Sequence, residues 1–222
     1  MQDLPTSSPG TLDVVYEDED LLVFDKPPGL LSVPGRGPDK QDCLSARAVA
    51  RYPDALVVHR LDMATSGLIV MARGAAIQRA LGDAFAARQV SKRYEAMVDG
   101  MPEYTDRPDA WHDIDAPIAA DWPRRPLRVI AAAGQPSLTR WQLLKSLPDR
   151  GASHLALAPV TGRTHQLRVH LAFIGHPILG DMLYGDASVQ QRAGRLMLHA
   201  TELELTHPAS GTPLHFESAS GF

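Results

Sequence analysis

Two short apolar runs flank a polar, glycine-containing segment around residue 60, and this pattern predicts a strand, a loop and a second strand. The first run covers residues 56–58 and the second covers residues 68–72. If the first strand extends to Asp62, the alternation of its faces places Arg60 and Asp62 on the same side. A carboxylate between apolar strands is costly unless it is paired with a cation or used in chemistry. Asp62 is therefore the first candidate for a functional residue.

The N-terminal quarter of the chain predicts a hairpin, a rigid connection and a short helix. Apolar residues in 12–16 and 21–25 flank an acidic turn, as in a hairpin. Residues 26–35 are too rich in proline and glycine for a regular helix. Asp42 is placed to cap a helix that covers residues 43–51.

The middle of the chain predicts a helix over residues 74–89 and a strand over residues 91–98. Apolar residues recur in the helix at intervals of four, from Ile77 onward, and form one stripe. In the strand, Lys92 and Tyr94 lie on the same face. Residues 101–135 are rich in proline and predict irregular structure.

Strands and one further helix are expected in the C-terminal half. The strands are predicted at residues 136–147, 152–160, 196–200 and 202–206. Residues 161–170 are predicted to form the start of the helix, and Gly175 is placed to terminate it. Strands and helices in this mixture indicate an α+β fold. We expect a flexible arm at residues 1–11 and a single domain over residues 12–222, because no linker separates two units.

Composition indicates a soluble cytoplasmic protein without a membrane segment. The chain has 222 residues, one cysteine, no basic and apolar leader, and no apolar run long enough to cross a bilayer. The net charge of −4 argues against binding to RNA, but residues 1–25 hold seven acids and no Lys or Arg, so the rest of the chain is net positive. Arginines gather at residues 73–93 and 124–140, and such patches can bind phosphates.

Other chemistries find little support. His165 and His170 are five residues apart, so a regular helix points them about 140° apart and no shared metal ion is expected. Ser66 lacks the Gly-x-Ser-x-Gly turn of a nucleophile elbow. The absence of a P-loop or a Gly-x-Gly-x-x-Gly sequence predicts that no nucleotide cofactor is used. Trp122 beside two arginines could stack on a base or simply pack at the surface.

The segment His59-Arg-Leu-Asp-x-x-Thr-Ser-Gly-Leu68 resembles the active-site motif of the RluA family of RNA pseudouridine synthases. Further segments resemble other motifs of that family. They are Lys26-Pro-x-Gly-Leu30, Lys92-x-Tyr94, Gly162-Arg-x-His-Gln-Leu-Arg168 and Leu198-His-Ala200. The resemblance implies a single catalytic domain with a bent mixed or antiparallel sheet, flanking helices and a central RNA-binding cleft. We expect no extra N-terminal RNA-binding module of the kind that some relatives carry.

The resemblance also implies roles for individual residues. Asp62 would be the catalytic carboxylate, Tyr94 would stack on the base, and Arg163 would pair with Asp62 and keep it ionised. Arg60 would fill the gap left by a uridine turned out of its stem. The remaining candidates for substrate binding are His59, Lys92, Arg124, Arg125, His165, Arg168 and Leu198.

The reaction implied is the isomerisation of uridine to pseudouridine, which needs no cofactor because substrate and product contain the same atoms. The short form of the chain and its Asp-Trp-Pro loop resemble the branch that acts on both 23S ribosomal RNA and the tRNA anticodon arm. A monomer is expected. The alternatives are a synthase acting on ribosomal RNA alone, a non-catalytic RNA-binding or ribosome-assembly protein, and a hydrolase that uses Asp62 as its nucleophile.

Overall fold

The computed structural model describes residues 11–102 and 110–222 of the chain. The strands are β1 (Asp13–Glu17), β2 (Leu21–Lys26), β3 (Ala55–Val57), β4 (Ser66–Arg73), β5 (Ser91–Asp99), β6 (His112–Asp115), β7 (Ile118–Ala120), β8 (Arg128–Ile130), β9 (Leu138–Leu147), β10 (Ala152–Pro159), β11 (Leu198–Thr206) and β12 (Pro213–Glu217). The helices are α1 (Leu44–Arg51), α2 (Ala75–Ala86), α3 (Gln166–Phe173) and α4 (Ala187–Gln191), with 3₁₀ turns at Pro38–Lys40 and Pro148–Arg150.

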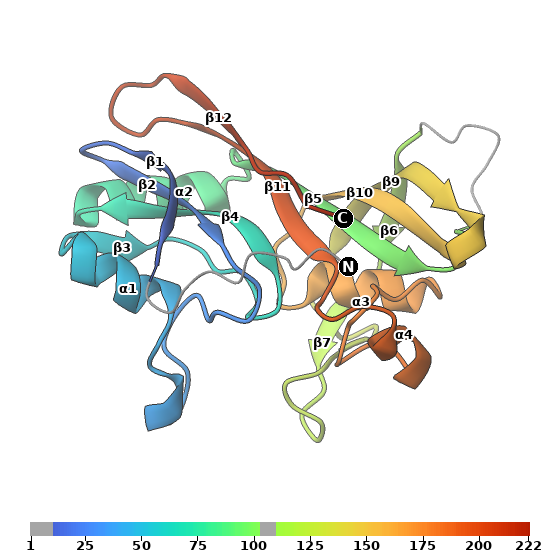
Figure 1. Ribbon diagram of the computed structural model, residues 1–222. Coiled ribbons are helices and arrows are strands. Elements are labelled where there is room, and N and C mark those ends of the chain that lie inside the picture. Colours follow the sequence, from blue (N-terminus) through green and yellow to red (C-terminus); the bar gives the residue numbers. More distant parts are fainter. Residues whose placement is uncertain (1–10, 103–109) are drawn as a thin grey trace.

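A ten-stranded mixed sheet runs through the whole molecule (Figure 1). Its order is β1-β2-β4-β11-β5-β10-β9-β6, while β3 pairs with β4 and β12 pairs with β11. The central pair β4 and β11 is parallel, and it joins an N-terminal half to a C-terminal half. β7 and β8 form a separate hairpin, which projects from the sheet on the side of α3 (Figure 1).

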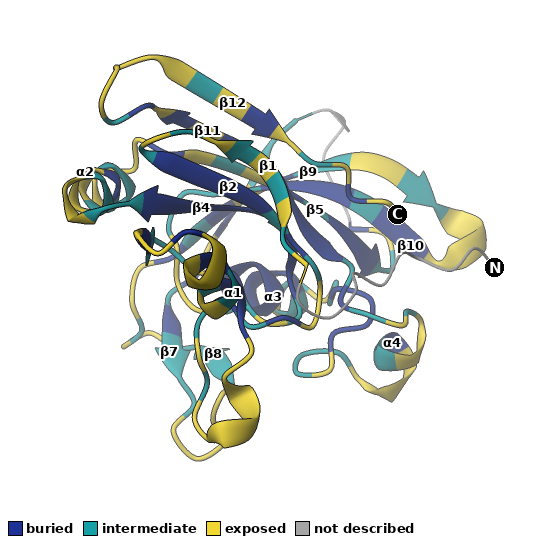
Figure 2. Cartoon of the chain, turned by 60° about the vertical axis from the view of Figure 1, so that its left-hand side comes forward, coloured by how far each residue is buried: buried dark blue, intermediate teal, exposed yellow. Residues whose placement is uncertain are grey.

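Within the N-terminal half, β2 and β4 are buried on both faces of the sheet, as their dark colour shows in Figure 2. Alternate residues of β4 enter two different cores. Ile69 packs in the cluster that contains Leu44 of α1, whereas Val70 packs in the cluster that contains Leu81 of α2. Full burial of an aliphatic side chain stabilises the fold by roughly 1.5–3 kcal/mol. The near-continuous apolar run of β4 is therefore a consequence of the helices on either side.

In the C-terminal half, α3 packs against β8, β9 and β10. Both ring nitrogens of His170, a fully buried residue of α3, are engaged: Nδ1 with Thr139 Oγ1 at 2.9 Å and Nε2 with the carbonyl of Ala116, also at 2.9 Å. These bonds lock the helix to β9 and to the segment before β7. As a result, the first turn of α3 has a fixed position beside the loop that follows β3.

The structure confirms several predicted elements. They are the hairpin of β1 and β2, the helices α1 and α2, and the strands β4, β5, β9 and β10. Three predictions were wrong in detail. The first strand of the central motif ends at Val57 and not at Asp62, α3 begins only at Gln166, and α1 is capped by Cys43, whose sulfur accepts the Ala46 N–H. The stretch expected to be irregular contains β6, β7 and β8, which alternate too briefly to stand out in a proline-rich sequence.

Three further elements differ from the expectation or were not expected. β11 is one continuous strand where two were predicted, and β12 and α4 were not predicted. The predicted arm lies, apart from Thr11, outside the described residues, and the division into an arm and one domain stays a prediction. Among the described residues, no helix has the length and hydrophobicity to cross a bilayer.

Candidate active site

A cleft of about 1140 Å³ opens between the loop after β3, the start of β5 and the segment that leads into α3. Among the described residues that line it, Asp62 is the only carboxylate. The cations that line it are Arg60, Arg88, Lys92, Arg140, Arg163 and Arg168. The net negative charge of the chain is therefore reversed where a ligand would enter, and the cleft suits a polyanion.

Asp62 lies in an irregular loop that is held by the last residue of β2 and by the segment that follows this strand. The Lys26 ammonium donates to the Met63 carbonyl at 3.2 Å. The Ser32 hydroxyl donates to the Leu61 carbonyl at 2.8 Å, and the Leu61 N–H donates back to that hydroxyl at 3.1 Å. These bonds flank Asp62 on both sides along the chain. A loop without strand pairing of its own can therefore present a carboxylate in a defined position.

Burial strongly perturbs Lys26. Its side chain is fully buried, and its ammonium also donates to the carbonyls of Pro27 and Leu30 at 2.9 and 2.8 Å. Burial lowers the pKa of Lys26 to about 7, although the charges of Asp62 and Asp25 oppose this shift. Lys26 thus supports the loop through carbonyl groups and adds a nearby positive charge whose amount depends on pH.

The partner of Asp62 is Arg168, in the first turn of α3. Arg168 Nη1 lies 3.3 Å from Asp62 Oδ2. The other edge of the guanidinium makes two bonds to Asp181, from Nε to Oδ2 at 2.8 Å and from Nη2 to Oδ1 at 2.6 Å. Asp181 is fully buried, Arg168 is 5% exposed and Asp62 is 26% exposed. The bidentate bond to Asp181 fixes the guanidinium, which then holds the more exposed carboxylate at the cleft.

The prediction that Arg163 pairs with Asp62 was wrong. Residues 161–165 are not helical, so Arg163 precedes α3 and is exposed. Its Nε donates to the carbonyl of Pro136 at 3.4 Å. The second arginine of the same motif, Arg168, takes the position because it lies inside the first helical turn. Arg168 lines the cleft while its guanidinium bonds two carboxylates, so the prediction that Arg168 binds substrate stays a prediction.

Tyr94 lies in β5 next to the carboxylate and lines the cleft. Burial raises the pKa of Tyr94, and the charge of Asp62 adds to the effect. The phenol is therefore neutral at any physiological pH. Leu198, at the start of β11, is 3% exposed and also lines the cleft. Together they provide apolar surface beside one carboxylate, which suits a flat, weakly polar ring.

Two neighbours in the central motif have different environments. His59 Nε2 accepts the Val70 N–H at 3.1 Å, and its ring stacks on Phe85 with centroids 4.6 Å apart. Burial, with the nearby charge of Lys92, lowers the pKa of His59 to about 3, so it is a neutral structural residue that anchors the loop to β4. Arg60 is exposed at the mouth of the cleft, as a contact with substrate requires.

The remaining basic candidates are divided between the cleft and the β7–β8 hairpin. Lys92 lines the cleft with its ammonium 5.7 Å from the centre of the Phe85 ring, and burial lowers its pKa. Arg124 and Arg125 lie in the turn of the hairpin, outside the residues that line the cleft. Arg125 stacks on Trp122 at 3.6 Å, and the indole is 69% exposed.

Sequence reasoning missed two residues of the site, Asp181 and Tyr184. Both lie in the loop before α4. Asp181 holds Arg168, while the Tyr184 hydroxyl lies 2.7 Å from His165 Nδ1 and accepts the Arg128 N–H at 2.9 Å. A fully buried Asp needs a cation, and two cations were available in the motif of α3. The need of a buried aspartate for a cationic partner was the signal in the sequence that pointed to Asp181.

The three histidines that could suggest a metal site contact different partners. His165 meets Tyr184, His170 meets Thr139 and Ala116, and His176 Nδ1 lies 2.8 Å from the Asp99 carbonyl.

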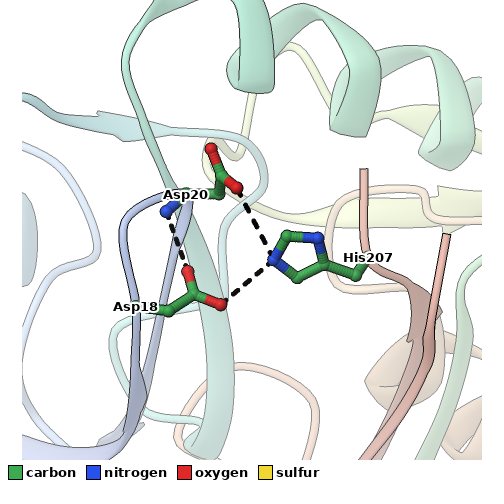
Figure 3. Close-up of side chains that lie close together, drawn as sticks. All are labelled: Asp18, Asp20 and His207. Atoms are coloured by element: carbon green, nitrogen blue, oxygen red, sulfur yellow. Dashed lines mark hydrogen bonds and ion pairs between the residues drawn. The ribbon is translucent and has the colours of Figure 1, made fainter. Parts of the chain in front are cut away.

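Another possible metal-binding group lies at the far end of the sheet, where His207 meets Asp18 and Asp20 (Figure 3). His207 Nδ1 accepts the N–H groups of Ala209 and Ser210 at 3.3 and 3.1 Å. The neutral ring therefore carries its proton on Nε2, which donates to Asp18 Oδ2 at 3.0 Å. A protonated nitrogen is no metal ligand, so this group joins two hairpins.

Ser66 is not placed for hydrolysis. It is 3% exposed, it is absent from the described residues that line the cleft, and its hydroxyl lies 2.8 Å from His199 Nδ1. Burial lowers the pKa of that histidine. His199 Nε2 contacts the Ser218 hydroxyl at 2.9 Å, and that hydroxyl donates to Asp25. The chain of bonds is internal and ties the C-terminal segment to β2.

The family model described as RNA pseudouridylate synthase matches residues 20–173, which include Asp62, Tyr94 and Arg168. The dual-specificity RNA pseudouridine synthase RluA of Yersinia pestis is 44% identical over 210 residues, 94% of this chain and 99% of the relative. The protein of the same name from Escherichia coli strain K12 is 42% identical over 212 residues, 95% of this chain and 94% of the relative.

Among solved structures, the human RNA pseudouridylate synthase domain containing 1 aligns with a TM-score of 0.79 at 29% identity, over 97% of this chain and 86% of that one. The human RNA pseudouridylate synthase domain containing 4 aligns with a TM-score of 0.71 at 27% identity, over 93% of this chain and 88% of that one. The predicted α+β fold, the predicted family and the prediction of an enzyme are confirmed. The chain belongs to the RNA pseudouridylate synthase family, and it is an isomerase that acts on uridine in RNA.

Proposed function

We propose that this enzyme converts loop uridines to pseudouridine in both 23S ribosomal RNA and the tRNA anticodon arm, with Asp62 as its catalytic residue. One observation carries the assignment of Asp62. It is the single carboxylate among the described residues of a cationic cleft, and a guanidinium anchored on Asp181 holds it there. The dual substrate is proposed from similarity to relatives whose names state dual specificity.

The site must support three steps of the reaction. The N1–C1′ bond of uridine breaks, the free uracil turns over, and a C5–C1′ bond forms while C5 loses a proton and N1 gains one. A carboxylate must stay ionised to attack C1′ or remove the 2′ proton, and Arg168 favours that form. The detached base must stay in place, which the apolar faces of Tyr94 and Leu198 would ensure.

The target uridine must leave its stem-loop stack before it can reach Asp62, because a paired or stacked base hides its sugar. We propose that exposed Arg60 enters the gap at the mouth of the cleft. Lys92 and Arg163 would hold backbone phosphates at the cleft wall. Arg124 and Arg125, on the β7–β8 hairpin, would contact the RNA outside the cleft.

We also propose that the enzyme works as a monomer in the cytoplasm. Asp62, Tyr94 and Arg168 come from one chain, so the site needs no second copy. Light scattering at micromolar concentration should give the mass of one chain, and a dimer that persists on dilution would contradict this.

The test is tritium release from RNA that contains 5-tritiated uridine. Wild type and Asp62→Asn are compared on four RNAs: a tRNA anticodon arm, a 23S ribosomal stem-loop, and a version of each with its loop uridines replaced by cytidine. A chelator is present throughout. We expect wild type to release about one equivalent from the first two RNAs only, and Asp62→Asn to release none while binding RNA as tightly.

Each departure from this result has one meaning. Release from the ribosomal stem-loop alone identifies a synthase restricted to ribosomal RNA. Binding without release by wild type contradicts catalysis on these RNAs and favours an RNA-binding role. Release by Asp62→Asn at the wild-type rate removes Asp62 from the mechanism.

A further inference from the structure

Tyr184 connects the backbone of β8 to His165, and the direction of its two hydrogen bonds is fixed by chemistry. The Arg128 N–H is a donor only, so at 2.9 Å the Tyr184 oxygen accepts from it. The phenol has one proton, and the other close partner of its oxygen is His165 Nδ1 at 2.7 Å. Burial raises the pKa of Tyr184 to about 12, so the proton is present at neutral pH. Tyr184 therefore donates to Nδ1.

This bond sets the tautomer of His165. A neutral imidazole ring whose Nδ1 accepts a hydrogen bond carries its own proton on Nε2. Burial lowers the pKa of His165, so the ring is neutral at physiological pH. Nε2 is also the nitrogen nearer the active site, 3.8 Å from Asp62 Oδ2. An N–H group, and not a lone pair, thus lies beside the carboxylate.

The backbone supports a functional reading of this residue. His165 has φ of 58°, in the left-handed region that is uncommon for residues other than glycine, although asparagine, aspartate and histidine adopt it more often than the rest. Such a conformation is strained and persists where surrounding contacts enforce it. Here it places the ring between Tyr184 and Asp62 immediately before α3. The strained residue therefore belongs to the site.

We infer that Tyr184 and His165 are positioning residues that present an N–H group to Asp62 and tie that group to β8 at the base of the β7–β8 hairpin. The inference rests on the proposed role of Asp62. The separation of 3.8 Å is longer than a hydrogen bond, and a shift of about 1 Å on binding RNA would complete one. The chain runs from the Arg128 N–H through Tyr184 and His165 to Asp62.

As a consequence, the chain of the Arg128 N–H, Tyr184, His165 and Asp62 links RNA held by the hairpin to the state of the catalytic carboxylate. The charged groups that face His165 are Asp62, Arg168, Asp181 and Arg128. Arg168 binds the same oxygen of Asp62, so the guanidinium supplies charge, while His165 supplies a second, neutral donor. Loss of the neutral donor should slow the chemical step without weakening RNA binding.

Three variants test whether the position of the N–H group beside Asp62, and not the folding of the chain, determines the rate. Tyr184→Phe removes the donor to Nδ1 and lets the ring proton move to that nitrogen. His165→Asn tolerates the left-handed backbone but is too short to place a donor at the Nε2 position, whereas His165→Gln places one there. Tyr16→Phe is the control, because its hydroxyl bonds Asp18 at 2.5 Å at the far hairpin.

The experiment measures single-turnover tritium release at saturating enzyme, with the Kd for the same RNA. We expect Tyr184→Phe and His165→Asn to lower the rate about tenfold with Kd unchanged within about twofold, and His165→Gln to recover part of the rate. Tyr16→Phe should match wild type. Wild-type rates in Tyr184→Phe, an effect on Kd alone, or equal losses in His165→Asn and His165→Gln would overturn the inference.

A second measurement does not depend on activity. In protein labelled with ¹⁵N-histidine, the His165 signals are those lost in His165→Asn, and at pH 7 we expect a protonated Nε2 and a bare Nδ1. A proton on Nδ1 in wild type overturns the inference even if the enzyme is fully active. Conversely, the expected tautomer in a protein that releases no tritium leaves the geometry standing and refutes the proposed substrates or catalysis.

Discussion

The floor of the cleft and the β7–β8 hairpin both hold an arginine on an aspartate, in opposite environments. Arg168 and Asp181 are 5% and 0% exposed, whereas Arg124 and Asp121 are 69% and 10% exposed. The two pairs share a 2.6 Å contact, so distance does not distinguish them. Burial does, because a buried pair that loses one member leaves an uncompensated charge and an exposed pair leaves a solvated one. The buried pair therefore fixes the geometry next to Asp62, whereas the exposed Arg124 can also contact a partner, as we propose for RNA.

The largest effect should come from Asp181→Asn. It removes the bidentate carboxylate partner of Arg168 and leaves this buried charge with one contact, to the partly exposed Asp62, so it should lower the free energy of unfolding by about 3–5 kcal/mol. Asp121→Asn, its counterpart on the hairpin, should cost under about 1 kcal/mol. Urea denaturation of both variants measures the difference. Equal losses would mean that burial does not separate the two pairs.

Next in size is the contrast between the two arginines of one motif. Arg168→Lys keeps the charge but has no planar fork to span Asp181 and Asp62, and should lower kcat/KM by about 30–1000-fold, or roughly 2–4 kcal/mol. Arg163→Lys should stay within about threefold, because Arg163 is exposed and touches only a carbonyl. Steady-state tritium release gives both values. A larger loss for Arg163→Lys would restore the original prediction for that residue.

That contrast also shows where sequence reasoning succeeds. Alternating and helical patterns predicted β1, β2, β4, β5 and α2 because each buries a regular face. Asp62 was found from one carboxylate between apolar runs, and its neighbours from motif resemblance.

The pairing of Asp62 was missed for a physical reason. The motif holds two arginines, and only the start of α3 decides which one lies in the first turn. That start depends on His165 in a left-handed conformation, held by contacts from Tyr184 nineteen positions away. No local periodicity encodes such a contact. The short strands β6, β7 and β8 were missed because their pairing, and not their composition, makes them strands.

A pH effect of intermediate size should follow from Lys26, which holds the loop that carries Asp62. With its pKa lowered from 10.5 to about 7, the folded chain releases above pH 7 a proton that the unfolded chain keeps until about pH 10.5. Stability from this group therefore rises with pH in that window, by up to about 1.4 kcal/mol per pH unit.

The measurement compares wild type with Lys26→Met by urea denaturation at pH 7.5 and 9.0. The difference in unfolding free energy between the two proteins should move by about 2 kcal/mol in favour of wild type as the pH rises. The variant also loses three bonds to carbonyls, so it is less stable at both pH values. A gap that does not change with pH would mean that Lys26 keeps its charge when folded.

The smallest effect should come from the hairpin, and it should appear in RNA binding alone. Trp122 is exposed and Arg125 already covers one face of its ring, so one face remains for a base. Stacking contributes about 1–3 kcal/mol per base, and a ring with one free face should give the lower figure. Trp122→Ala should therefore weaken RNA binding about fivefold and leave both the unfolding free energy and the saturated single-turnover rate unchanged.

Trp111→Ala is the matched control, because Arg93 stacks on that ring at 5.3 Å outside the residues that line the cleft. Equal losses of affinity in the two variants would show that any Trp–Arg stack outside the cleft contributes and that the hairpin has no special contact with RNA. A loss confined to Trp122→Ala would place the RNA on the hairpin, whose base is joined to Asp62 through Tyr184 and His165.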